Sequence, residues 1–98
     1  MKYVRLDVTF VAAKMKRKYV FPFANDLSHS MMAGAMKAVL QADWPAPAHT
    51  VDIVSAGEID VEAGATWGRS VSLLGLLAKE EDAEILNTTD YSGHVEAL

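Results

Sequence analysis

The stretch "KYVRLDVTFVA" at residues 2–12 alternates between two kinds of side chain. Val4, Leu6, Val8 and Phe10 share one face, and mostly polar residues occupy the other. A period of two residues is the pattern of a half-buried β-strand, because successive side chains of a strand point to opposite faces. The chain therefore begins with a strand that needs cover on one side.

A second alternating run follows at residues 17–23. Its aromatic residues fall on one face: Tyr19, Phe21 and Phe23. Pro22 has no N–H to donate to a neighbouring strand, so we expect this strand to lie at a sheet edge or to end there. The polar stretch 13–16 between the two runs predicts a β-hairpin.

The apolar spacing becomes helical from Leu27 to Gln41. Asn25 or Asp26 is the expected N-cap. Gly34 lowers helix propensity by about 1 kcal/mol relative to alanine, which close packing could explain. The broad apolar face predicts a helix that packs on a sheet. The proline-rich stretch 42–49 then ends the helix.

Strand chemistry returns at residues 50–62, where Gly57 predicts a bulge or a short turn. Residues 63–66 have turn composition. Residues 67–76 favour a strand, and 79–87 favour a helix with acidic residues in its first turn.

A single helix over about 70–87 is the alternative for the region after residue 67. The tail at 88–98 shows turn chemistry and little periodicity.

This order predicts one α+β domain over residues 1–98. We expect a mostly antiparallel sheet of four or five strands, with one long helix packed on one face and a short C-terminal helix. A 98-residue chain has room for one small core, and domains of this size often gain buried surface by dimerising.

Charge is unevenly distributed along the chain. Residues 1–49 carry seven cations and three acids (7 − 3 = +4), whereas residues 50–98 carry two cations and ten acids (2 − 10 = −8). Such asymmetry can mark interaction faces, unless the fold mixes the two halves. The candidate partner-binding residues are Lys16, Arg17, Lys18, Glu58, Asp60, Glu62, Glu80, Glu81, Asp82 and Glu84.

The sequence predicts no catalytic, metal or cofactor site. It has no cysteine, which excludes disulfides and thiolate chemistry. Its three histidines lack the spacing of a metal site, and no glycine-rich phosphate loop is present. Ser30, His49 and Asp52 contain the residue types of a triad but no nucleophile elbow.

The basic and aromatic run at 13–23 suggests two structures. It could bind nucleic acid by stacking bases on its aromatic residues. We favour a structural hairpin, with the aromatic face buried under the helix and the cations at an exposed tip. Direct nucleic-acid binding is therefore not expected.

The leading functional hypothesis is a small, non-enzymatic, cytoplasmic protein-interaction module that forms a homodimer. Its expected dimer contacts are Met32, Met36, Leu40 and Trp44, since methionine suits adaptable interfaces. The alternative is an acidic, phage-derived inhibitor that occupies a basic nucleic-acid-binding site on a partner protein. We expect neither a signal peptide nor a membrane span.

Overall fold

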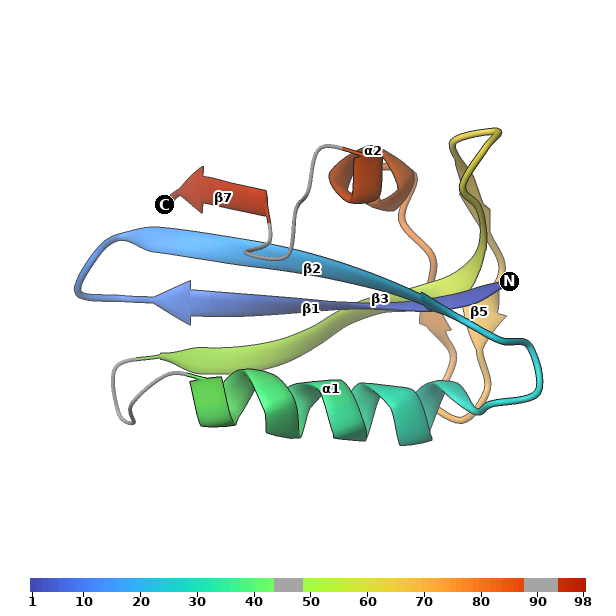
Figure 1. Cartoon of the computed structure of the whole chain (residues 1–98), viewed down its shortest axis with the longest axis horizontal. Helices are drawn as coiled ribbons and strands as arrows, with labels where there is room; N and C mark the ends of the chain where they lie inside the picture. The colour runs from blue at the N-terminus through green and yellow to red at the C-terminus, as the bar shows by residue number, and fades with distance from the viewer. Residues whose placement is uncertain (44–48, 88–93) are drawn as a thin grey trace.

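A computed structural model describes residues 1–43, 49–87 and 94–98. Its strands are β1 (Lys2–Phe10), β2 (Met15–Phe23), β3 (Thr50–Asp60), β4 (Ala65–Trp67), β5 (Arg69–Ser70), β6 (Leu76–Leu77) and β7 (His94–Ala97). Its helices are α1 (His29–Asp43) and α2 (Asp82–Asn87). An antiparallel sheet in the order β4-β3-β1-β2-β7 lies between α1 and α2 (Figure 1). The predicted α+β fold class is confirmed.

The hairpin of β1 and β2 is in register from Lys2 opposite Phe23 to Phe10 opposite Met15. Its turn spans residues 11–14, two residues earlier than expected. Lys14 lies in this turn with a φ of 51°. The other cations of the basic run lie within β2, so the expected cationic tip reduces to one lysine.

Pro22 lies at an edge, as its missing N–H predicts. β7 pairs with β2 only from Met15 to Lys18. Pro22 lies beyond that paired stretch, and its only described strand neighbour is Tyr3 of β1. The proline therefore removes no bond from the described sheet.

Helix α1 begins two residues later than expected because Ser28, and not Asn25 or Asp26, caps it. The Oγ atom of Ser28 accepts a hydrogen bond from the backbone N–H of Met31 at 3.1 Å. This is the usual role of a serine at a helix N-terminus, where backbone donors lack helical partners.

The main core lies between α1 and the sheet. Its buried residues are Val4, Leu6, Val8, Tyr19, Phe23, Ala33, Leu40, Val51 and Ala56. Phe21 packs against this cluster, and its ring stacks on that of Tyr19. The aromatic face of β2 is thus covered by the helix, as predicted.

The opposite face of β1 is also covered, which corrects the expectation of a half-buried strand. Tyr3 is 0% exposed, and Arg5 and Asp7 are each 3% exposed. A second apolar cluster lies between the sheet and α2, and consists of Tyr3, Val20 and Ile59 of the strands with Ala83 and Ile85 of the helix. The sheet therefore forms the middle of three layers (Figure 1).

Strand β3 continues through Gly57, so neither a bulge nor a turn forms at that residue. The register shift falls where Ile53 pairs with Leu6 and Ser55 pairs with Arg5, leaving Val54 as the extra residue. Gly57 is buried, and a Cβ atom there would lie 2.5 Å from the carbonyl oxygen of Trp67. Close approach of two backbones explains this glycine.

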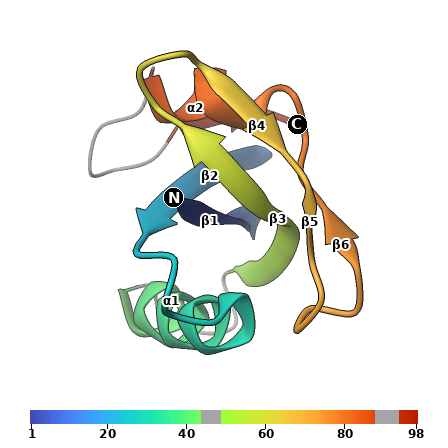
Figure 2. The same ribbon diagram turned by 90° about the vertical axis from the view of Figure 1, so that its right-hand side faces the viewer.

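Residues 67–76 form neither the predicted long strand nor the alternative helix. After β4, Gly68 adopts a φ of 80° and turns the chain. β5 and β6 then pair as a separate two-stranded sheet beside β3 (Figure 2). Helix α2 lies within the predicted range 79–87, whereas strand β7 was not predicted.

Candidate functional site

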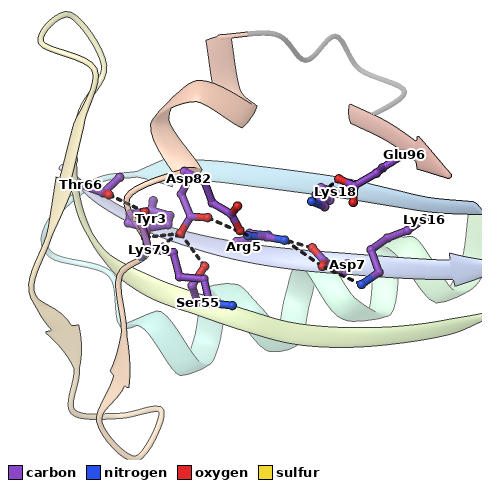
Figure 3. Close-up of polar contacts among 11 residues, drawn as sticks. Tyr3, Arg5, Asp7, Lys16, Lys18, Ser55, Thr66, Lys79, Asp82 and Glu96 are labelled. Atoms are coloured by element: carbon purple, nitrogen blue, oxygen red, sulfur yellow. Dashed lines mark hydrogen bonds and ion pairs between the residues drawn. The ribbon is translucent and has the colours of Figure 1, made fainter. Parts of the chain in front are cut away.

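A buried polar cluster joins the sheet to the segment that leads into α2 (Figure 3). At its centre, the carboxylate of Asp82 is 0% exposed. It accepts hydrogen bonds from Tyr3 Oη at 2.5 Å, Ser55 Oγ at 2.6 Å and Arg5 Nη1 at 3.1 Å. The backbone N–H of Lys79 adds a fourth donor at 3.2 Å. The buried Asp82 carboxylate therefore has hydrogen-bond donors at both of its oxygens.

Arg5 links this carboxylate to a second one. Its Nε and Nη2 atoms donate to the two carboxylate oxygens of Asp7, at 2.9 and 3.0 Å. Its Nη1 atom also donates to Glu81 at 2.5 Å. Lys16 Nζ lies 3.7 Å from Asp7. Opposite charges thus alternate along the cluster, the arrangement that makes burial of charge tolerable.

The surroundings shift the pKa of three groups. Burial, together with the hydrogen bond to Asp82, raises the pKa of Tyr3 well above its usual range. Burial lowers the pKa of Arg5, but hydrogen bonds to Asp7 and Glu81 outweigh it and raise that pKa above its ordinary value. The Arg5 guanidinium in turn lowers the pKa of Glu81. Each group is therefore held in the protonation state that the cluster requires.

The cluster acts as a structural connection. Tyr3, Ser55 and Asp82 are each 0% exposed, so a substrate cannot reach them in this conformation. Lys79 is held at both backbone groups: its N–H donates to Tyr3 and Asp82, and its carbonyl accepts from Thr66 Oγ1 at 2.6 Å. These contacts fix residues 79–82 to the sheet.

The prediction that Asp82 lies on the surface is wrong, because the residue is fully buried. Tyr3, Arg5 and Ser55 were not predicted as members of a cluster. The available signal was an arginine and an aspartate two residues apart on one face of a strand, which can pair directly. A strand in the centre of a sheet needs such pairing where it carries charge.

The remaining acidic candidates differ in their surroundings. Glu58 lines a cleft beside the start of α1, together with Lys2 and Arg69. Glu81 contacts Arg5 on the α2 side of the sheet. The other acidic candidates are all exposed: Asp60, Glu62, Glu80 and Glu84. Of these, Asp60 ends β3, and Glu62 lies in the turn beyond it.

The basic candidates are also divided. Lys18 is 9% exposed and forms an ion pair with Glu96 of β7. Lys16 lies on the same face, near Asp7. Arg17 pairs in register with Val8, whose side chain lies in the α1 core, so it belongs to the opposite face. The three cations therefore form no common patch.

The predicted dimer contacts are mostly internal. Leu40 is 4% exposed and belongs to the main core, which corrects its assignment as an interface residue. Met32 and Met36 are half-buried and pack against that core. Trp44 lies outside the described residues.

The most exposed apolar feature was not predicted. It is the segment 69–77, which we call the apolar hairpin and which consists of β5, a turn and β6. Val71 is 84% exposed, Leu77 is 62% exposed and Leu74 is fully exposed. Leu73 and Leu76 pack against the main core and anchor the hairpin. The only sequence signal was a leucine-rich run that fits neither helical nor strand periodicity.

Leu74 also has an unusual backbone conformation. Its φ of 57° lies in the left-handed region, which leucine rarely occupies. The Oγ atom of Ser72 accepts a hydrogen bond from the N–H of Ser30, so the turn of the hairpin lies against the start of α1. A fixed turn thus presents an exposed leucine.

Searches against protein-family models, curated proteins and solved structures found no match for this chain. No helix within the described ranges is long and apolar enough to cross a membrane. Residues 1–43, 49–87 and 94–98 contain no group of three His, Asp or Glu side chains that could hold a metal ion.

Proposed function

We propose that the chain is a non-enzymatic, homodimeric protein-interaction module that binds a partner protein through its apolar hairpin. The observation that carries this proposal is Leu74, whose side chain is fully exposed at the turn of the hairpin. Exposed apolar groups that cluster on one element are a feature of interaction sites. The partner would supply an apolar pocket.

The backbone of Leu74 supports the same proposal. A non-glycine residue in the left-handed region costs about 1–2 kcal/mol. Contact of the leucine side chain with water is also unfavourable. Binding of a partner over this side chain would offset both costs. Strained residues are concentrated at functional sites for this reason.

The acidic-inhibitor alternative draws less support from the distribution of charge. Glu58 lies near Lys2 and Arg69, while Glu81 is paired with Arg5 on the other face of the sheet. A partner that binds acidic charge would therefore find Asp82 buried and Glu81 already paired, and would depend on the four exposed candidates Asp60, Glu62, Glu80 and Glu84. We place the module in the cytoplasm, with which a cysteine-free sequence is compatible.

Affinity capture from a lysate of the source organism, with the tagged full chain as bait, tests the proposal. We expect the wild type to retain a specific protein that Leu74→Asn does not retain. Asparagine tolerates the left-handed region better than leucine does, so this variant should unfold at a higher temperature. Loss of binding together with gain of stability cannot be explained by misfolding.

Val11→Asn is the matched control, because Val11 is 69% exposed in the turn of the β1–β2 hairpin. It should capture the same protein as the wild type. Capture by apolar contact should persist at high salt, whereas loss at high salt would favour the acidic inhibitor. Equal capture by wild type and Leu74→Asn, or no specific capture, would contradict the proposal.

A further inference from the structure

The outer face of α1, directed away from the sheet, is mostly apolar. Its exposed apolar or small residues are Met31, Gly34, Ala35, Ala38, Val39 and Ala42, and the uncharged polar residues Ser30 and Gln41 lie at one side of them. Met31 is 63% exposed and Val39 is 50% exposed. A surface helix normally presents charged and polar side chains to water, and a helix that is apolar all round is normally buried. The isolated chain leaves this face without cover.

The outer face is also flat near its middle. A Cβ atom added at Gly34 would meet nothing within 4 Å, so the space beside the helix is open. The midpoint of the helix is Met36, and Gly34 and Ala38 lie two residues to either side. A two-fold axis near Met36 would therefore bring Gly34 against Ala38 of a second helix. Small residues at such a crossing let helix backbones approach closely.

Charge at the two ends of α1 supports this antiparallel arrangement. The described helix has no acidic residue in its first turn and no basic residue in its last turn. Its final residue is Asp43, whose carboxylate lies at the negative end of the helix dipole. Lys2 and Arg69 line a cleft beside the first turn, near the positive end. Asp26 in the preceding turn and Glu58 in the same cleft offset these two cations, so the positive end of the helix dipole is the feature that attracts Asp43.

We propose that the outer face of α1 binds a second copy of this chain, with the two helices antiparallel about a two-fold axis near Met36. The proposal rests on the dimeric module proposed above and names its interface. Each Asp43 then lies beside the positive end of the partner helix, where its charge is favourable. The same two-fold axis satisfies both ends at once, as a closed symmetric dimer requires.

The expected dimer is of modest affinity. A standard interface buries about 800 Å² per partner, which is close to one seventh of the 5732 Å² surface of the chain. Only one helix face of each chain takes part in the contact. We therefore expect a reversible dimer rather than a permanent one.

Sedimentation velocity of the full chain over a wide concentration range tests the interface. The wild type should show a reversible monomer–dimer equilibrium. Ala38→Glu should raise the dissociation constant at least tenfold, because it places a charge at the centre of the contact. Ala13→Glu is the matched control, since Ala13 is exposed in the β1–β2 turn, and it should leave the dissociation constant unchanged.

The variant Asp43→Lys is a second, independent test of the helix interface. Lysine at a helix C-terminus favours the isolated helix, so the thermal midpoint of the dilute monomer should rise. The same change should raise the dimer dissociation constant several-fold. A wild type that stays monomeric throughout, or an Ala38→Glu variant with unchanged dimerisation, would overturn the inference.

The interface and the apolar hairpin can fail separately. Leu74→Asn should dimerise like the wild type, and Ala38→Glu should still capture the hairpin's partner. If Leu74→Asn abolished dimerisation, the hairpin itself would be the dimer contact and the helix interface would be wrong. If Ala38→Glu dimerised more weakly and also lost capture, the proposal that the hairpin alone binds the partner would be wrong, and the helix interface would still hold.

Discussion

Tyr3 Oη donates a hydrogen bond to Asp82 Oδ2 at 2.5 Å, and both side chains are fully closed to solvent. The two residues are 79 positions apart in the sequence. This bond and its neighbours connect the first strand to the last described helix. Stability should therefore depend strongly on the Asp82 carboxylate.

Asp82→Ala should lower the free energy of unfolding by about 3–5 kcal/mol, because removing one partner of a buried ion pair leaves the other charge buried without compensation. Tyr3, Ser55 and Arg5 would all lose an acceptor. Urea denaturation followed by circular dichroism measures the change. Glu84→Gln, on the exposed side of α2, should stay within about 0.5 kcal/mol of the wild type. A small effect of Asp82→Ala would show that the cluster contributes little.

Alkaline pH should destabilise the protein through Tyr3. The pKa of this phenol is raised in the folded state, whereas in the unfolded chain it returns to about 10. As the pH rises, the tyrosine of the unfolded state loses its proton first. The contribution of Tyr3 to the free energy of unfolding is therefore fully present below pH 10 and falls as the pH rises beyond that value. Denaturant titrations across this range should show the decline.

Tyr3→Phe is the control for the alkaline effect. This variant lacks the ionisable group. Below pH 10 its free energy of unfolding should be lower than that of the wild type, since Asp82 loses one donor. Its stability should then fall less steeply above pH 10 than that of the wild type. Parallel slopes for the two proteins would assign the decline to other groups.

Acidic pH should weaken the contact between Arg5 and Glu81. The Glu81 pKa lies below its usual 4.5 in the folded state. The pair therefore stabilises the fold at pH values above 4.5, and this contribution disappears as the pH falls through the folded-state pKa. Wild type and Glu81→Gln should differ in stability near neutral pH and converge in acid. A difference that is constant with pH would contradict this linkage.

Gly57→Ala should destabilise the fold by about 1–3 kcal/mol, the usual cost of overpacking. The new Cβ atom would lie 2.5 Å from the Trp67 carbonyl oxygen and 2.8 Å from the Ala78 Cβ atom. Gly34→Ala is a control of opposite sign, because open space and a helical backbone should make it stabilising by about 1 kcal/mol. Thermal unfolding at low protein concentration compares them. An unchanged midpoint for Gly57→Ala would mean that the strands can separate locally.

The sequence predicted the elements whose periodicity extends over many residues. β1, β2 and α1 each repeat an apolar spacing along their length and bury that face in the main core. The aromatic face of β2 was correctly predicted to lie under the helix for the same reason. Only its cations were misplaced, because the turn begins at residue 11.

The apolar hairpin could not be predicted from periodicity. β5 and β6 have two residues each, which is too short for a pattern. Their geometry depends on positive φ angles at Gly68, Leu74 and Gly75. Leucine gives no sign in the sequence that it will adopt such an angle. The most exposed apolar residue was therefore the hardest to foresee.

The polar face of β1 was misjudged because its cover comes from the other end of the chain. Charged residues on a strand normally indicate solvent, and Arg5 and Asp7 follow that pattern in the sequence. Whether they lie in water depends on α2, which closes over them from residue 82 onward.

The dimer prediction named methionines on the inner side of α1, because a broad apolar helix does not show which side meets the sheet.

The order of synthesis gives the Tyr3–Asp82 connection a further consequence. While the ribosome is still adding residues, β1, β2 and α1 are available, but the acceptor for Tyr3 and Ser55 has not yet emerged. The guanidinium of Arg5 must then remain hydrated beside Asp7, on a sheet that lacks its third layer. We expect the nascent chain to stay loosely packed until α2 leaves the exit tunnel, since distant contacts close last. This domain would then complete its folding only after Asp82 and the rest of α2 have been synthesised.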